Sequence, residues 1–142
     1  MPDIRRVTDD FSVAPQLAPE DMAGLAGRFA LVINNRPDGE ETGQPCGEDV
    51  AQAARAAGLA YAAIPVTGPP GAPEVEAMRR AVSEASGPVL AYCRTGTRCI
   101  VTWALGEALQ GRPSGELTRL GAEAGYDLAP PLQMLLPRLA RP

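Results

Sequence analysis

The sequence predicts an α/β domain of three layers, in which a largely parallel sheet of four to five strands is flanked by helices. Short apolar runs that are typical of buried strands alternate with longer segments whose apolar residues recur at helical spacing. Such alternation favours a parallel sheet. With 142 residues, of which 45% are hydrophobic, the chain can bury a sizeable core. We therefore predict a single domain over residues 1–142.

Four segments have the pattern of strands. Residues 29–34, 59–66 and 88–92 are apolar runs that we expect in the sheet, and residues 11–14 alternate in the manner of a short edge strand. The polar loop 35–41, which contains proline and glycine, can continue neither a helix nor a strand.

Five segments have helical spacing or helix-terminal residues. The first predicted helix begins near residue 19, the second covers residues 47–57 and ends at Gly58, and the third extends from about residue 75 to before Gly87. A fourth is predicted over residues 100–109. Further helical segments are predicted within residues 114–140, where Pro130, Pro131 and Pro137 are expected as interruptions.

The composition excludes several classes of chemistry. The sequence contains no histidine and no lysine, so all 13 cationic side chains are arginines. A Ser-His-Asp or Cys-His arrangement, a histidine-bound metal and a Schiff-base lysine are therefore impossible within it. The net charge of -4 argues against nucleic acid or an anionic membrane as the main partner.

The three cysteines are an odd number without a CxxC pair, which favours neither a disulfide framework nor a zinc site. We predict no cofactor and no metal. No apolar signal segment follows the first residues and no run approaches transmembrane length, so we expect a cytoplasmic protein.

The octapeptide 92–99, Tyr-Cys-Arg-Thr-Gly-Thr-Arg-Cys, is the most informative stretch. It lies between a predicted strand and a predicted helix. At such a junction backbone N–H groups and the positive end of the helix dipole stabilise a thiolate and an anion beside it. A buried structural thiol is the alternative for Cys93, but two arginines within the next five positions are unsuited to an apolar core.

We therefore predict that Cys93 is a nucleophile and that the residues after it form an anion-binding loop. Gly96 permits a tight backbone path, and Arg98 can present a planar fork to an anion. The predicted anion-binding residues are Arg94, Thr95, Gly96, Thr97 and Arg98. Because loops 34–41 and 93–98 both follow strands, they are expected to line one pocket at the carboxyl ends of those strands.

Four separated stretches resemble one family over nearly the whole chain. They are residues 11–17, 32–40, 92–98 and 125–128. In them the chain resembles the phosphatase-like domain that also occurs fused in beta-lactamase-hydrolase-like proteins, a family with a protein-tyrosine-phosphatase-like fold. The resemblance implies that Cys93 is the nucleophile, that Arg98 binds the anion, and that Asn34, Asn35 and Arg36, with the residues up to Asp38, form a neighbouring active-site loop.

The cysteine loop departs from that of tyrosine phosphatases in its length. Those enzymes resemble one another in having five residues between the cysteine and the arginine, whereas four lie between Cys93 and Arg98. In this respect the loop resembles the six-residue active loop of rhodanese sulfurtransferases. The smaller cradle suits a sulfane sulfur or thiosulfate better than a full phosphate.

A cysteine phosphatase also needs a carboxylic acid that protonates the leaving group. In dual-specificity relatives this acid lies on the loop before the helix that precedes the nucleophile. The corresponding loop here, residues 67–73, contains none. Asp38 is the first candidate from the neighbouring strand end, with Glu40 and Glu41 as alternatives, although a solvated turn acid is an equally good interpretation of Asp38. Transfer of sulfur between thiolates needs no acid.

Three functions remain open, and a sulfurtransferase is favoured. In that enzyme Cys93 would take a sulfane sulfur from an anionic donor such as thiosulfate or glutathione persulfide, hold it as a persulfide, and pass it to a thiol acceptor. The alternative is a phosphatase that hydrolyses phosphomonoesters through a phosphocysteine at Cys93. The third is a catalytically silent module that binds an anion.

The other two cysteines have different expected roles. Cys99 occupies a position where phosphatase relatives usually have serine or threonine, so it is expected to be a small residue at the start of a helix. As a neighbour of Cys93 it is also a candidate redox partner, either as an acceptor of sulfur or in a disulfide. Cys46 is expected to be exposed.

Overall fold

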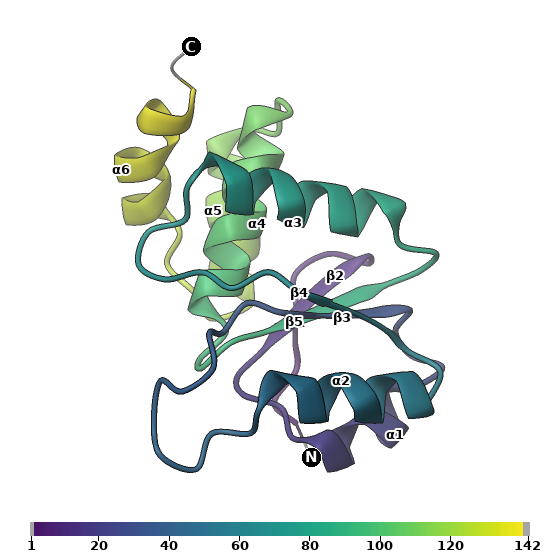
Figure 1. Ribbon diagram of the computed structural model, residues 1–142. Coiled ribbons are helices and arrows are strands. Elements are labelled where there is room, and N and C mark those ends of the chain that lie inside the picture. Colours follow the sequence, from purple (N-terminus) through teal and green to yellow (C-terminus); the bar gives the residue numbers. More distant parts are fainter. Residues whose placement is uncertain (1, 141–142) are drawn as a thin grey trace.

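A five-stranded sheet forms the middle layer of the protein (Figure 1). The computed structural model describes residues 2–140. The strands are β1 (Arg5–Arg6), β2 (Phe11–Ala14), β3 (Leu31–Asn34), β4 (Ala60–Ala63) and β5 (Val89–Tyr92), in the order β1-β2-β5-β3-β4. All neighbours from β2 to β4 are parallel, and only the two-residue β1 pairs antiparallel. The predicted, largely parallel sheet is confirmed.

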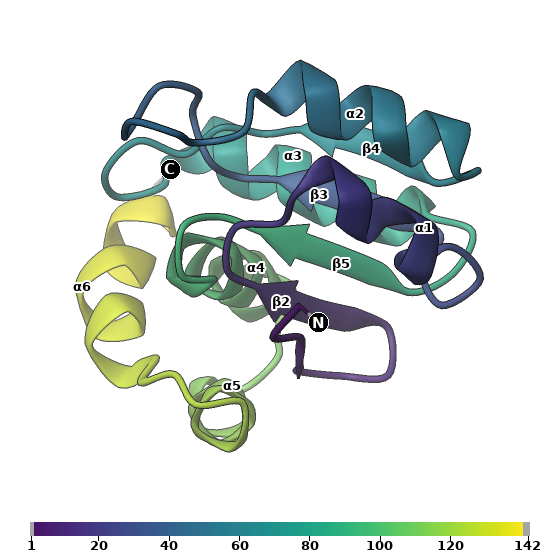
Figure 2. The ribbon, with the colours of Figure 1, turned by 90° about the horizontal axis from the view of Figure 1, so that it is seen from below.

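Helices cover both faces of this sheet, as the views in Figures 1 and 2 show. One face carries the 3-10 helix η1 (Pro19–Asp21), α1 (Met22–Leu25) and α2 (Gly47–Ala56). The other face carries α3 (Ala72–Glu84) and α4 (Thr97–Leu109), and α5 (Ser114–Glu123) and α6 (Ala129–Leu139) pack beside α4. The three predicted layers are therefore present.

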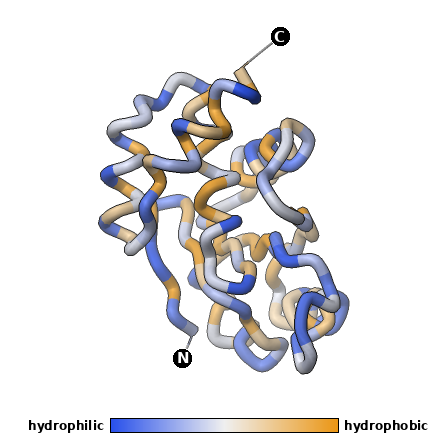
Figure 3. Tube along the Cα trace, turned by 90° about the vertical axis from the view of Figure 1, so that its left-hand side faces the viewer, coloured by the Kyte–Doolittle hydropathy of each residue, from blue (hydrophilic) through white to orange (hydrophobic). Residues whose placement is uncertain are grey.

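The sheet separates two hydrophobic clusters, because side chains of a strand alternate between its two faces. Val13, Ile33 and Ala91 point into the larger cluster with α3 to α6, whereas Val32 and Leu90 point into the smaller one with α1 and α2. In Figure 3 the hydrophobic segments run through the interior, and hydrophilic segments lie mainly on the outer turns.

Some predicted boundaries differ from the structure. β2 is not an edge strand, because β1 pairs along its outer side, and all four of its residues are buried. α4 begins at Thr97, three residues before the apolar segment that predicted it. Pro130 and Pro131 lie in the first turn of α6, where proline needs no backbone N–H partner, so they start a helix and do not interrupt one.

The strand register brings the carboxyl ends of the inner strands together. Tyr92, the last residue of β5, lies opposite Ala14 of β2 and Asn34 of β3. Since the strands are parallel, the segments that follow β2, β3, β4 and β5 all leave the same edge of the sheet. In the part of the chain that the structure describes, no helix has the length and apolarity required to cross a membrane.

Replacement of Phe11 by alanine is expected to lower the free energy of unfolding by about 3–5 kcal/mol. Phe11 is 1% exposed and stacks on Trp103 with ring centroids 5.0 Å apart, so the truncation leaves a cavity between β2 and α4. Urea unfolding followed by circular dichroism measures the change. Met134→Ala is the control, because Met134 is 63% exposed; equal losses in the two variants would contradict the assignment of Phe11 to the core.

Candidate active site

Cys93 is the first residue after β5 and lies at the base of a tight loop that leads into α4. The loop turns at Gly96, whose φ of +92° is in the left-handed region that favours glycine. This turn directs the backbone N–H of Gly96 at the Cys93 sulfur, to which it donates a hydrogen bond of 3.1 Å. Cys93 is only 1% exposed, so the sulfur lies inside the loop.

The surroundings of Cys93 lower the pKa of its thiol from 9.0 to about 5. A hydrogen bond from the Cys99 thiol contributes most, and the backbone N–H groups of Thr95, Gly96 and Cys99 add to it, whereas burial opposes the shift. Cys93 is therefore a thiolate at neutral pH. The N–H groups that the sequence predicted take part, and the Cys99 thiol is a further donor.

Cys99 itself is fully buried, and burial raises the pKa of its thiol well above the usual value. It therefore stays protonated and can donate to the Cys93 thiolate. Its place in the first turn of α4 agrees with the small helix-start residue that was expected. A redox exchange between the two sulfurs stays a prediction. Cys46 is exposed, as expected.

Arg98 lies in the first turn of α4 and is fixed by groups from two other segments. Its Nη1 donates to Glu40 Oε2 at 2.8 Å and to the Val66 carbonyl at 3.0 Å, and its Nη2 donates to Glu40 Oε1 at 2.8 Å. The pKa of the guanidinium is raised, first by the hydrogen bonds to Glu40 and also by the nearby Cys93 thiolate. The structure thus brings Arg98 and Cys93 together, as the sequence predicted.

Glu40 holds a second arginine as well. Arg36 Nε donates to Glu40 Oε1 at 2.9 Å, so this one carboxylate bridges Arg36 and Arg98. Hydrogen bonds from Arg98 and then from Arg36 lower the pKa of Glu40 from 4.5 to about 2. At neutral pH the side chain is therefore a fixed carboxylate.

Arg36 is a buried cation, only 3% exposed, whose partners surround it. Besides Glu40 it binds Glu41 Oε1 at 2.8 Å through Nη2 and Gln16 Oε1 at 3.0 Å through Nη1. Arg94 is exposed, with its Nε 3.9 Å from Glu41. Of the predicted arginines, Arg98 therefore lies next to the thiolate, Arg36 is the buried member of the ion-pair network, and Arg94 is exposed to solvent.

Asn34 and Asn35 connect the strand ends. The side-chain amide of Asn34 donates to Tyr61 Oη at 2.9 Å and accepts from the backbone N–H of Arg36 at 2.8 Å. The backbone carbonyl of Asn35 accepts a 3.0 Å hydrogen bond from the backbone N–H of Val66. This bond fixes Val66, whose carbonyl accepts a hydrogen bond from Arg98. Asn35, which belongs to the predicted neighbouring loop, therefore helps to position Arg98.

Asp38 accepts the backbone N–H of Gly47 at 2.8 Å, so its carboxylate satisfies the first residue of α2. It lines a separate cavity with Asn34, Tyr61 and Gly47. This contact agrees with the interpretation of Asp38 as a turn acid. Its role as a general acid stays a prediction.

Three further groups of the site had no assigned role in the sequence analysis. They are the Gln16 amide, the Val66 carbonyl and the hydroxyl of Tyr126, which donates to the Thr95 carbonyl at 2.9 Å. Gln16 and Tyr126 lie in the stretches that resemble the family, which is the only signal that marked them. A backbone carbonyl carries no such signal.

The cavity next to the cysteine loop has a volume of about 460 Å³ and is lined by Arg36, Glu40, Glu41, Arg94 and Arg98. A second cavity of about 610 Å³ shares three of these residues and extends over Gln16, Thr95 and the segment 42–45. Charged side chains from the segment after β3 and from the cysteine loop therefore meet at one entrance.

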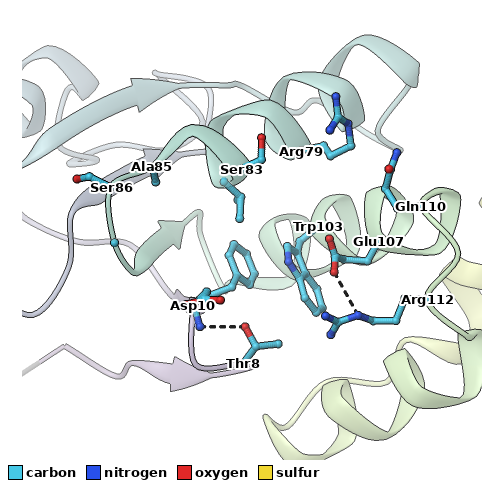
Figure 4. Close-up of a pocket in the computed structure, with 13 residues that line it drawn as sticks. Thr8, Asp10, Arg79, Ser83, Ala85, Ser86, Trp103, Glu107, Gln110 and Arg112 are labelled. Carbon is cyan, nitrogen blue, oxygen red and sulfur yellow. Dashed lines mark hydrogen bonds and ion pairs between the residues drawn. The ribbon is translucent and has the colours of Figure 1, made fainter.

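Another cavity, of about 540 Å³, lies at the amino ends of β2 and β5 and is shown in Figure 4. Both of its arginines and Glu107 already have partners. Arg112 pairs with Glu107 at 3.2 Å and lies over the Trp103 ring, and Arg79 pairs with Glu76. We therefore assign the candidate active site to the cysteine loop.

Substitution of Glu40 by glutamine is expected to weaken the fold in a pH-dependent way. Because the folded-state pKa of Glu40 lies below 4.5, its ion pairs stabilise the fold fully above that pH, and this stabilisation is lost as the pH falls toward 2. The difference in unfolding free energy between wild type and Glu40→Gln should therefore shrink over this range. Urea titrations monitored by Trp103 fluorescence measure it.

The matched control is Glu123→Gln, which removes a pair with Arg119 on the exposed surface of α5. Pairs of this kind contribute little to stability. A difference for Glu40→Gln that stays constant across the range would contradict the low pKa.

Alkylation of Cys93 by iodoacetamide is expected to rise with pH around a midpoint near 5, because only the thiolate reacts. A Cys46→Ser background removes the exposed thiol, and mass spectrometry locates the product. Loss of the signal in Cys46→Ser/Cys93→Ser verifies the assignment. A midpoint near the free-thiol value of about 8.5 would contradict the stabilised thiolate.

Comparison with known proteins identifies the family to which this chain is similar. The model of the "Beta-lactamase hydrolase-like protein, phosphatase-like domain" matches residues 3–110. The beta-lactamase hydrolase-like protein of Agrobacterium fabrum is 40% identical over 126 residues, which are 87% of this chain and 29% of that protein. The chain thus spans less than a third of this relative.

Solved structures agree with this match. A Neisseria meningitidis protein described as a "putative phosphatase" is 34% identical with a TM-score of 0.79, over 96% of each chain. Tk-PTP in its active form is 16% identical with a TM-score of 0.68, over 95% of this chain and 97% of that one, which shows the shared fold.

These matches support the phosphatase alternative and do not support the sulfurtransferase that the short loop favoured. Loop length and a missing acid restrict the chemistry, but they do not identify the group that is transferred. The chain belongs to the family of phosphatase-like domains of beta-lactamase hydrolase-like proteins, and it has the tyrosine-phosphatase-like fold.

Proposed function

We propose that this domain hydrolyses phosphomonoesters through a phosphocysteine at Cys93. The observation that carries the proposal is the thiolate of Cys93 inside a loop whose Gly96 N–H lies 3.1 Å from the sulfur, with Arg98 beside it. A nucleophile that is ionised at neutral pH and a set of donors for an anion are the two requirements of this chemistry.

Arg98 can bind a phosphate without breaking its pair with Glu40. Within residues 2–140, the hydrogen bonds to Glu40 and Val66 use both N–H groups of Nη1 and one of Nη2. The Nε–H and the second N–H of Nη2 lie on one edge of the planar guanidinium and form a second fork. This fork can bind two phosphate oxygens, while Glu40 keeps the guanidinium in place.

The reaction has two steps. The Cys93 thiolate attacks phosphorus, a sulfur–phosphorus bond forms, and the ester oxygen leaves with its electron pair. Water then attacks the phosphocysteine, the sulfur–phosphorus bond breaks, and phosphate and the Cys93 thiolate are released. Loop amides and Arg98 stabilise the charge on the phosphoryl oxygens in both steps.

Glu40 is unsuited to protonate the leaving oxygen, because its pKa of about 2 keeps it ionised. The hydrogen bond of Asp38 to Gly47 gives that carboxyl a structural task. We therefore expect a preference for aryl phosphates, whose leaving groups need less help from an acid than alkoxides do.

Sulfur transfer is the second candidate, and the ionised state of Glu40 is the observation that favours it. The Cys93 thiolate would attack the outer sulfur of thiosulfate, the sulfur–sulfur bond would break, and sulfite would leave with the electron pair. An acceptor thiolate would then remove the sulfur from the persulfide. Neither step needs a carboxylic acid.

Hydrolysis of p-nitrophenyl phosphate is expected, with a loss of about 10³-fold or more in Cys93→Ser and of about 10²–10³-fold in Arg98→Ala. The first variant lacks the nucleophile and the second lacks the fork. Release of p-nitrophenol measures the rate. Arg55→Ala is the matched control, because Arg55 is an exposed arginine on α2 that pairs with Glu48.

The competing functions give different results. Sulfite release from thiosulfate, a mass gain of about 32 Da on Cys93 and no p-nitrophenol would replace the phosphatase by the sulfurtransferase. Tight binding of phosphate without turnover of either substrate would indicate the silent anion-binding module.

A further inference from the structure

Tyr126 lies in the connection between α5 and α6, far in sequence from the cysteine loop. Its hydroxyl donates a 2.9 Å hydrogen bond to the backbone carbonyl of Thr95, in the middle of that loop. Tyr126 belongs to the stretch 125–128, which the resemblance singled out and to which the chemistry above assigns no role. The contact connects this stretch to the active-site loop.

The carbonyl that Tyr126 holds belongs to the same peptide unit as the N–H of Gly96. In a planar trans peptide the C=O and N–H groups point in opposite directions. A hydroxyl that fixes the Thr95 carbonyl on the outside of the loop therefore also fixes the Gly96 N–H on the inside. That N–H is the one that donates to the Cys93 sulfur at 3.1 Å.

The space at Gly96 provides an independent observation. A methyl group on Gly96 would lie 2.3 Å from the Tyr126 hydroxyl and 3.2 Å from its ring carbon Cζ. Tyr126 therefore approaches the loop backbone so closely that only glycine leaves room for it. Glycine serves this approach as well as the left-handed turn.

The connection that carries Tyr126 is itself anchored. The backbone N–H of Tyr126 donates to the Gly121 carbonyl at 2.8 Å, and Leu128 is buried against the core at 1% exposure. Arg5 donates to the Ala124 carbonyl at 3.1 Å and ties the turn to β1. The tyrosine hydroxyl is thus held on a fixed support.

We propose that Tyr126 is a positioning residue of the active site, which stabilises the Cys93 thiolate by holding the Thr95–Gly96 peptide in the orientation that points its N–H at the sulfur. The role concerns the loop and holds whether a phosphoryl group or a sulfur is transferred. Tyr126 acts through the peptide and does not contact the sulfur itself in this scheme.

The test is Tyr126→Phe in the Cys46→Ser background, with the pH profile of Cys93 alkylation by iodoacetamide as the readout. Cys99 and Arg98, which also face the thiolate, are unchanged in this variant. The midpoint is expected to rise by about one-half to one pH unit relative to the parent, which corresponds to the partial loss of one hydrogen bond. A merely structural role would lower the melting temperature and leave the midpoint in place.

Tyr61→Phe is the matched control, because its hydroxyl contacts the side chains of Asn34 and Tyr92, at 2.9 and 3.5 Å, and bonds to no described residue of the loop 93–98. It should not move the midpoint. Gly96→Ala is a second variant, whose methyl group displaces the same hydroxyl and should raise the midpoint as well. An unchanged midpoint in a folded Tyr126→Phe, or an equal rise in Tyr61→Phe, would overturn the proposal, and neither result depends on which substrate the domain uses.

Discussion

A negative charge on the buried sulfur of Cys93 is the constraint on which the rest of the site depends. Burial alone disfavours an ion, because it removes the water that would solvate the charge. Here the Cys99 thiol and the loop N–H groups replace that water and lower the pKa of Cys93 to about 5. So many donors converge on one atom only if the backbone turns sharply, and the left-handed conformation of Gly96 makes this turn possible.

A second set of buried charges organises the entrance of the site. Arg36 is nearly inaccessible to water and needs carboxylate partners, and Glu40 serves both Arg36 and Arg98. The segment after β3 is therefore part of the active-site architecture. This arrangement has a chemical consequence. The Glu40 carboxylate that orients Arg98 stays ionised at neutral pH and has no proton to donate. In the proposed phosphatase reaction this carboxylate could therefore not protonate the leaving group.

Much of the fold follows from local patterns in the sequence. The apolar runs at 29–34 and 88–92 are strands, the alanine-rich run after Gly47 is a helix, and the strand ends do carry the site, as expected for a parallel sheet. Boundaries that depend on other parts of the chain were missed. β2 has the alternation of an edge strand, but β1 pairs along its outer side. α4 begins three residues before the apolar segment, because Thr97 and Arg98 are helical although they are polar.

The sequence by itself predicted Cys93 as the nucleophile, identified the arginine five residues beyond it, and excluded histidine and lysine chemistry, because these are properties of residue type and short spacing. The tertiary structure decided which groups control that nucleophile. Glu40 reaches Arg98 across 58 positions and Tyr126 reaches Thr95 across 31, so no local pattern encodes either contact. Both arise because parallel strands end at one edge of the sheet and the α5–α6 connection returns to it, which brings distant polar groups within hydrogen-bond distance of a single loop.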